Sequence, residues 1–192
     1  KAAGQVLTAD EQMMMLNGTE VYASVYANGQ WITTRLTENS TADMAPVVAS
    51  NGQKAVVAWR AVSSSNLENG ANGGTLFDQR DSILYKVYDG NSWSEVKTLY
   101  NGTSGAVKGI VADMMADGTA AVAYALDTDL NDSTTTDREI AYAVIDSKNG
   151  EVTRTIQACS CFSFSKAPGY SSRLSSTSWH TSWASGTEFR ME

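Results

Sequence analysis

The sequence predicts an all-β protein in which sheets of four antiparallel strands recur along the chain. Three observations support this fold class: an apolar strand pattern that recurs three times, short turns rich in Gly, Asn and Asp, and no stretch of more than ten residues with helical periodicity. The 192 residues are enough for one domain with a core or for a short array of repeats. The recurring pattern favours the array.

The clearest recurring segment is an extended, partly alternating run that is followed each time by a tight turn. Its three copies are Val21–Tyr26, Ile83–Tyr88 and Ile140–Ile145. The turns behind them contain Asn28-Gly29, Asp89-Gly90 and Asn149-Gly150. Asn-Gly and Asp-Gly between apolar runs are strong hairpin signals, because type I′ turns need positive φ. Each copy is therefore predicted to form a hairpin with a short strand that ends near Leu36, Leu99 or Ile156.

A second recurring pattern, two small apolar strands joined by a tight turn, precedes the first. It runs from Pro46–Ala49 into Ala55–Trp59, from Gly109–Ala112 into Ala121–Tyr124 and, more faintly, from Gln5–Thr8 into Met13–Leu16. These strands alternate little between apolar and polar residues, as expected of strands that are buried on both faces. Each repeat is therefore predicted to contain four consecutive strands joined as hairpins.

The two patterns divide residues 1–157 into three repeats, at about residues 4–36, 45–99 and 108–157, which we call repeats 1, 2 and 3. Repeated four-stranded antiparallel units predict blades of a β-propeller type, about three blades or half of a six-bladed ring. A β-sandwich or a solenoid is the alternative, although a sandwich would not require the same strand pattern in each repeat. Residues 158–192 break the pattern and are predicted to be an irregular Ser-rich tail without paired strands, either a linker or a non-native extension.

Composition narrows the classes of function. The net charge of −7 argues against nucleic-acid binding, because phosphate binding needs clustered Lys and Arg. No run of 18 apolar residues is present, so no membrane span is predicted. The abundance of Asn, Ser, Thr and Gly is typical of a secreted or cell-surface protein. Cys159 and Cys161 are too close for an easy disulfide and lack the further ligands that a zinc site needs.

The repeats differ in length mainly between their second and third strands. This connection is Asn17-Gly18 in repeat 1, Ala61–Arg80 in repeat 2 and Asp127–Asp137 in repeat 3. In a four-stranded blade these connections lie on the same face as those between blades, so both long loops gather there. Loops on a rigid scaffold commonly carry binding residues. A long polar loop that is merely tolerated is the alternative, because loop closure costs little per added residue.

Residues beside these loops are the candidates for ligand binding. Trp59 and Tyr124 share one repeat position, where an aromatic ring could stack on a sugar; aromatic packing between blades is the alternative. Asp78, Arg80 and Asp81 form a charge cluster before the third strand of repeat 2, for which a local ion pair is the alternative. The predicted ligand-binding residues are Trp59, Arg60, Asp78, Arg80 and Tyr124.

The loop of repeat 3 has a pattern that calcium could use. Oxygen-bearing side chains at its first, third and fifth positions are similar to the start of an EF-hand loop. The loop departs from that pattern because Asp132 replaces the glycine and Arg138 stands where the last ligand would be. A solvated acidic loop is the alternative, and no other cofactor is predicted. The predicted metal ligands are Asp127, Asp129, Asn131 and Asp137.

Trp31 and Trp93 share another repeat position, directly after the turn between the third and fourth strands. Each is predicted to pack on the neighbouring blade. Three blades leave an apolar face open at each end, and large exposed apolar faces usually become interfaces. We therefore expect a homodimer that completes a six-bladed ring, or a tail that covers one face.

Two longer phrases carry a resemblance to known proteins. Ile-x-Tyr-x-Val-Tyr-Asp-Gly-x-x-Trp-Ser in residues 83–94 and Pro-Val-Val-Ala-x-Asn-Gly-x-x-Ala-Val-Val-Ala-Trp in residues 46–59 resemble extracellular bacterial β-propeller repeats of the sialidase-like, sugar-associated style. The resemblance covers about residues 4–156 and implies a fold rather than an activity. A sialidase Asp-box would read Ser-x-Asp-x-Gly-x-x-Trp, and Asp89–Trp93 has a different spacing. No catalytic residue is therefore carried over.

These observations predict a non-catalytic extracellular binding module that holds a glycan or a protein on its loop-bearing face. The alternative is a fragment of a sialidase-like glycoside hydrolase whose other blades supply the missing groups. Glycosidases generally use two carboxylates held about 5–10 Å apart. Asp78, Asp127 and Asp129 are candidates for that role by location alone.

Overall fold

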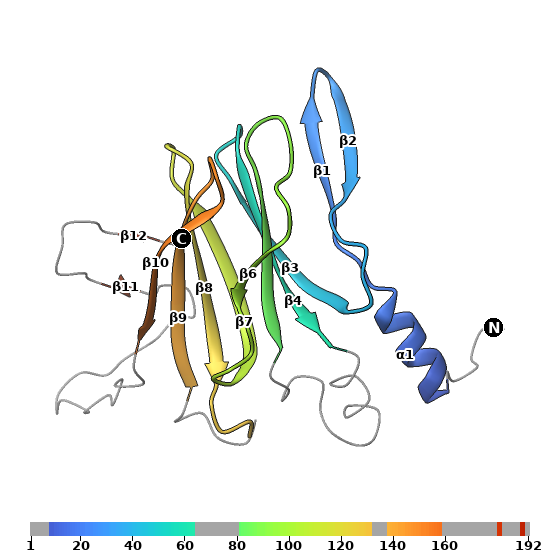
Figure 1. The fold of residues 1–192 in the computed structure, drawn as a ribbon. Helices are drawn as coiled ribbons and strands as arrows, with labels where there is room; N and C mark the ends of the chain where they lie inside the picture. The colour runs from blue at the N-terminus through green and yellow to red at the C-terminus, as the bar shows by residue number, and fades with distance from the viewer. Residues whose placement is uncertain (1–7, 64–80, 132–137, 159–179, 182–188, 191–192) are drawn as a thin grey trace, which may run out of the picture. The chain divides into compact units, whose positions relative to one another are not determined.

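The computed structural model describes residues 8–63, 81–131, 138–158, 180–181 and 189–190. The chain divides into two compact parts, Lys1–Ser160 and Cys161–Glu192. The described residues of the first part are mostly strand, which confirms the predicted all-β class (Figure 1). Its elements are α1 (Ala9–Asn17), β1 (Tyr22–Ala27), β2 (Gln30–Arg35), β3 (Ala42–Ser50), β4 (Ala55–Val62), β5 (Ser82–Tyr88), β6 (Lys97–Tyr100), β7 (Ala106–Met114), β8 (Thr119–Asp127), β9 (Arg138–Asp146) and β10 (Glu151–Ala158).

Repeats 2 and 3 each form a four-stranded antiparallel sheet of consecutive hairpins. The strand orders are β3-β4-β5-β6 and β7-β8-β9-β10, and β1 and β2 form a separate two-stranded sheet. Tyr26, Tyr88 and Ile145 lie in three different sheets, on β1, β5 and β9, as the repeat pattern predicts. The four-stranded antiparallel unit is thus confirmed for two repeats. The described sheets do not form a closed propeller.

Repeat 1 differs from the prediction, because Met13–Leu16 belongs to α1 and not to a strand. Thr8 begins this helix: its Oγ1 accepts the backbone N–H of Glu11, and the Glu11 carboxylate accepts the backbone N–H of Thr8 at 2.9 Å. This reciprocal capping box satisfies two donors of the first turn. Met and Leu are also good helix formers. The predicted strand at Met13–Leu16 is therefore wrong, and most of the strand predicted before it, residues 5–7, lies outside the described residues.

Repeats 2 and 3 share the larger hydrophobic core. Alternate residues of β5 and β8 point into it, and their buried side chains pack in one cluster. This alternation is what a strand needs to present every second side chain to a partner sheet. The members from β5 and β8 are Ile83, Tyr85, Val87, Ala120, Val122, Tyr124 and Leu126.

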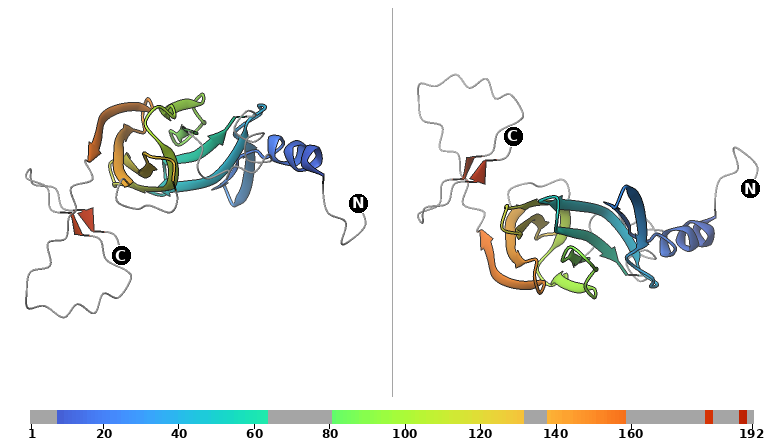
Figure 2. Two further views of the ribbon diagram at one scale, coloured as in Figure 1. Left: turned by 90° about the horizontal axis from the view of Figure 1, so that it is seen from below. Right: turned by 90° about the horizontal axis from the view of Figure 1, so that it is seen from above.

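The other face of the middle sheet packs against repeat 1. Val57, Trp59 and Ala61 of β4 are buried in a cluster with Val21 and Leu36, which flank the β1–β2 hairpin. The middle sheet, teal to green in Figure 2, thus lies between that hairpin and the sheet of repeat 3. Seven of the eight residues of β4 are buried, which explains why its sequence alternates so little.

The two tryptophans that share a repeat position have different surroundings. Trp93 is half-buried and packs against the cluster that contains residues of repeat 1, as predicted. Trp31 is 69% exposed, so the prediction that it packs on a neighbouring blade is wrong for the described residues. The physical reason is that, within the described residues of Lys1–Ser160, no other sheet packs on that face of the β1–β2 hairpin.

The turns at one end of the sheets join repeats 2 and 3. Lys97 Nζ donates to the carbonyl oxygens of Asn149 (2.7 Å) and Gly150 (3.1 Å), and Asn51 Nδ2 donates to Ala116 O (3.1 Å). Gly118 has a φ of +91°, and a Cβ there would lie 2.6 Å from Ser147 Oγ of the same repeat and 2.9 Å from Lys54 Cδ of repeat 2. Glycine is therefore needed at this position for its backbone angle and for the close approach.

In the second compact part, β11 (His180–Thr181) pairs antiparallel with β12 (Phe189–Arg190). The expectation of a tail without paired strands is therefore wrong for these residues, although each strand has only two. Cys159 and Cys161 lie outside the described residues. The helix that the structure describes is too short to span a membrane.

Candidate ligand-binding site

A pocket of about 370 Å³ lies where the sheets of repeats 2 and 3 meet. One wall is the end of β6 with the connection that follows it, and the other comes from β8, β9 and β10. β6 ends shortly before β7 begins, and β8 ends where the loop of repeat 3 begins, so the pocket lies at the loop-bearing end of these sheets. The lining residues are Thr98, Leu99, Tyr100, Asn101, Thr103, Ser104, Tyr124, Leu126, Ala141 and Thr155.

Two tyrosine rings form the aromatic part of the lining. The ring centroids of Tyr100 and Tyr124 are 5.6 Å apart, and the planes are tilted by 37°. Both side chains are largely buried, since Tyr100 is 8% and Tyr124 is 5% exposed. Burial, and to a smaller extent the neighbouring Tyr100, raises the pKa of Tyr124. Its phenol is therefore protonated at neutral pH and keeps a hydrogen to donate.

The Tyr100 hydroxyl fixes the connection that forms the rim. It accepts the backbone N–H groups of Ser104 and Gly105, each at 2.8 Å, and donates to Gly105 O at 2.9 Å. Gly105 also lies directly against the backbone at the end of β8, since a Cβ there would be 2.5 Å from the Asp127 carbonyl oxygen. The rim between β6 and β7 is therefore held by the same residue that supplies one of the rings.

The polar part of the lining consists of neutral groups. Thr98, Thr103, Ser104 and Thr155 contribute hydroxyls, and Asn101 contributes an amide; all five residues are exposed. Hydroxyls and amides both donate and accept hydrogen bonds without carrying charge. Together with the rings, they suit a neutral, polyhydroxylated ligand better than a charged one.

Of the predicted ligand-binding residues, Tyr124 lines this pocket and Trp59 does not. Trp59 is 0% exposed and faces repeat 1, where its Nε1 donates to Asp43 Oδ1 at 2.9 Å. Tyr124 instead faces repeat 2. The two rings thus share a repeat position but lie in different interfaces. Trp59 packs between repeats 1 and 2, and Tyr124 packs between repeats 2 and 3.

The predicted charged candidates are only partly described. Arg60 is 4% exposed and forms a buried ion pair with Asp81, in which Nε lies 2.5 Å from Oδ2. Asp81 at the start of β5 thus pairs with Arg60, a pair that the sequence analysis did not predict. Asp78 and Arg80 lie outside the described residues.

The predicted calcium ligands are spread over different surroundings. Asp127 is 0% exposed, and its Oδ2 lies 3.3 Å from Lys108 Nζ. Asp129 Oδ1 accepts the backbone N–H of Asn131 at 2.8 Å, and Asp137 lies outside the described residues. Within the described ranges, no three His, Cys, Asp or Glu side chains are grouped so that they could hold a metal ion.

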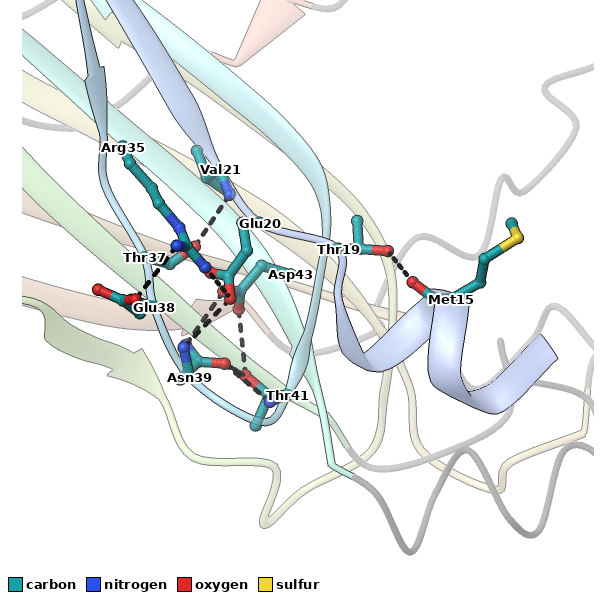
Figure 3. Close-up of polar contacts among 10 residues, drawn as sticks. All are labelled: Met15, Thr19, Glu20, Val21, Arg35, Thr37, Glu38, Asn39, Thr41 and Asp43. Carbon is teal, nitrogen blue, oxygen red and sulfur yellow. Dashed lines mark hydrogen bonds and ion pairs between the residues drawn. The ribbon is translucent and has the colours of Figure 1, made fainter. Parts of the chain in front are cut away.

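A second polar cluster joins repeat 1 to repeat 2 (Figure 3). Glu20 Oε1 accepts from Arg35 Nη2 (3.0 Å) and from the Asn39 backbone N–H (3.2 Å). Asn39 Nδ2 in turn donates to Asp43 Oδ2 (3.1 Å). Burial alone would raise the pKa of the Glu20 carboxyl, but hydrogen bonds from Thr37, Asn39 and Arg35 outweigh it and lower this pKa. The side chains of this cluster form hydrogen bonds with one another, so the cluster connects repeat 1 to the start of β3 and has a structural role.

The sequence analysis did not single out Tyr100, Asn101 or Ser104. A signal was present: an aromatic residue ends the fourth strand of repeat 2, and a short polar connection follows it on the loop-bearing face. These residues line the pocket only because two sheets pack together, and the pattern of residues within one strand carries no information about that packing.

Comparisons with known protein families, curated proteins and solved structures found no match for this chain. The fold and the pocket define its class: a β-rich protein with four-stranded antiparallel sheets and a neutral, aromatic-walled pocket where two of these sheets meet.

Proposed function

We propose that this chain is a non-catalytic, extracellular binding module of the β-propeller type, and that its ligand is a glycan bound in the pocket that Tyr100 and Tyr124 line. The observation that carries the proposal is the composition of the pocket: two tyrosine rings beside hydroxyl and amide groups. A sugar presents apolar C–H groups on its ring faces and hydroxyls around its edge. Aromatic rings pack against the first, and neutral donors and acceptors pair with the second.

The size of the pocket supports a small ligand or the end of a longer one. Its volume of about 370 Å³ is near the lower end of the range of about 300–1,000 Å³ found for ligand pockets. A terminal sugar of a glycan fits that description better than a protein segment, which would need a broad surface. Its position beside the loops also supports recognition, because binding residues are commonly carried there by a rigid scaffold.

A glycan array with the purified chain tests the proposal, and the sugars that bind would then be titrated by calorimetry. Asn101→Ala removes an exposed amide from the pocket, and we expect it to weaken binding about tenfold. Asn91→Ala is the matched control, since Asn91 is an exposed asparagine at the other end of β6, in the turn after β5. It should bind like the wild type.

The same glycans would be incubated with the chain and their products separated. Binding without cleavage supports the non-catalytic module. Hydrolysis would favour the fragment of a glycoside hydrolase. If no glycan binds, or if both substitutions have equal effects, the pocket is not a glycan site.

A further inference from the structure

Each repeat has two sheet faces, which we name by their neighbours. The leading face lies toward the preceding repeat, and the trailing face lies toward the following repeat. In repeat 2 the leading face carries Trp59, Leu84 and Trp93, which pack on repeat 1. In repeat 3 the leading face carries Tyr124 and Ile145, which pack on the trailing face of repeat 2. A leading face is therefore covered by a trailing face at both junctions within the chain.

The leading face of repeat 1 has the same construction but no described cover. Tyr26 lies opposite Trp31 on this hairpin, and Tyr88 lies opposite Trp93 in repeat 2; the ring centroids are 5.3 Å apart in the first pair and 5.2 Å in the second. Trp93 is half-buried, whereas Trp31 is 69% exposed. Tyr22 and Tyr26, on the same face, are 59% and 62% exposed.

Among the described residues of Lys1–Ser160, the trailing face of repeat 3 is uncovered in the same way. Ile140 matches Ile83 of repeat 2 by repeat position, yet Ile83 is 0% exposed and Ile140 is 52% exposed. Val111 lies on this face as well, because it pairs with Ala123 across the sheet, and it is 49% exposed. The two open faces are thus the two halves of the junction that the chain builds twice internally.

We propose that the leading face of repeat 1, formed by Tyr22, Tyr26 and Trp31, docks on the trailing face of repeat 3 of a second copy of this chain. The occupant follows from the repeat itself, since the internal junctions show which surface covers a leading face. The contact joins two different surfaces, so it is heterologous. Chains joined in this way either close into a ring or add further copies to form a filament. Two copies give the smallest ring in which every such face is covered.

The test measures the mass of the full chain by sedimentation over a range of concentrations. We expect twice the mass of one chain. Trp31→Ser and Ile140→Ser, which alter one face each, should both weaken association more than tenfold, because buried aromatic and aliphatic anchors dominate interfaces. Met14→Ser is the control: Met14 is 76% exposed on α1 and belongs to neither face. Circular dichroism and melting temperature would verify that all variants fold.

Mixing the two single-face variants distinguishes this contact from one that pairs the same face of both chains. The Trp31→Ser chain keeps its trailing face and the Ile140→Ser chain keeps its leading face, so the mixture should form a mixed dimer that neither variant forms alone. A wild-type chain that stays monomeric at all concentrations overturns the proposal. It is also overturned if the monomer protects Trp31 from solvent quenching, because residues of the same chain then cover the face.

Discussion

The phenolic oxygen of Tyr85 donates a hydrogen bond of 2.8 Å to the carbonyl oxygen of Gly150, across the boundary between repeats 2 and 3. Tyr85 is 2% exposed, and Gly150 ends the turn between β9 and β10. The bond therefore connects the core of one repeat to a turn of the next. It lies in the same junction as the pocket, although at the opposite end of the sheets.

Removing this bond tests how strongly the junction contributes to stability. We expect Tyr85→Phe to lower the free energy of unfolding by about 1 kcal/mol, because it deletes a buried hydrogen bond and keeps the ring. Urea denaturation measures this change. Tyr88→Phe is the control, because Tyr88 ends the same strand and is only half-buried. Equal losses in both variants would contradict a junction held in part by Tyr85.

The lowered pKa of Glu20 predicts that the stability of the fold depends on pH in the acidic range. Its hydrogen bonds lower its pKa below the ordinary 4.5, so its contribution is present above about pH 4.5 and is lost as the pH falls through the folded-state pKa. Glu20→Gln should lower the melting temperature at pH 7 by about 2–4 °C. The difference from the wild type should shrink below pH 4.5. A difference that stays constant down to low pH would show that the charge of Glu20 is not what stabilises the polar cluster between repeats 1 and 2.

The buried pair of Arg60 and Asp81 predicts strongly non-additive substitutions. Arg60→Met removes the cation from a fully buried carboxylate and should cost about 3–5 kcal/mol of stability. Adding Asp81→Asn removes the charge that was left behind, so we expect the double variant to be more stable than Arg60→Met alone. Chemical denaturation of the two single variants and the double variant gives the coupling energy. Additive effects would mean that the pair does not act as a unit.

Alanine substitutions at two glycines with positive φ separate the energetic cost of backbone strain from that of a steric clash. Gly29 has a φ of +80° and open space at its Cβ position, whereas Gly118 has a φ of +91° and would place its Cβ 2.6 Å from Ser147 Oγ. Gly29→Ala should therefore cost about 1–2 kcal/mol from strain alone. Gly118→Ala should cost clearly more, as measured by thermal unfolding. The reverse order would contradict the tight packing around the Gly118 turn.

Much of the fold could be predicted because its signals are local. The turn dipeptides and the recurring strand placed β5 and β9 at matching positions, and the poor alternation of Ala55–Trp59 correctly indicated a strand buried on both faces. Met13–Leu16 was misjudged because a short apolar run alone does not distinguish a strand from a helix. The capping box of Thr8 and Glu11 decides for the helix.

The candidate site could be predicted only in part, since it forms where two sheets meet. The repeat alignment singled out Tyr124, but it gave equal weight to Trp59, whose face is covered by repeat 1. The position of Tyr100 beside Tyr124 depends on the packing of β6 against β8. Such a contact between distant segments leaves no periodic signal in the sequence.

The most direct test of the glycan site is a crystal structure of the chain with the sugar that the array identifies. We expect the sugar to lie in the pocket against the rings of Tyr100 and Tyr124 and to form hydrogen bonds with Asn101 or Ser104. A sugar bound on another surface, with this pocket filled only by water, would show that the pocket is not the glycan site.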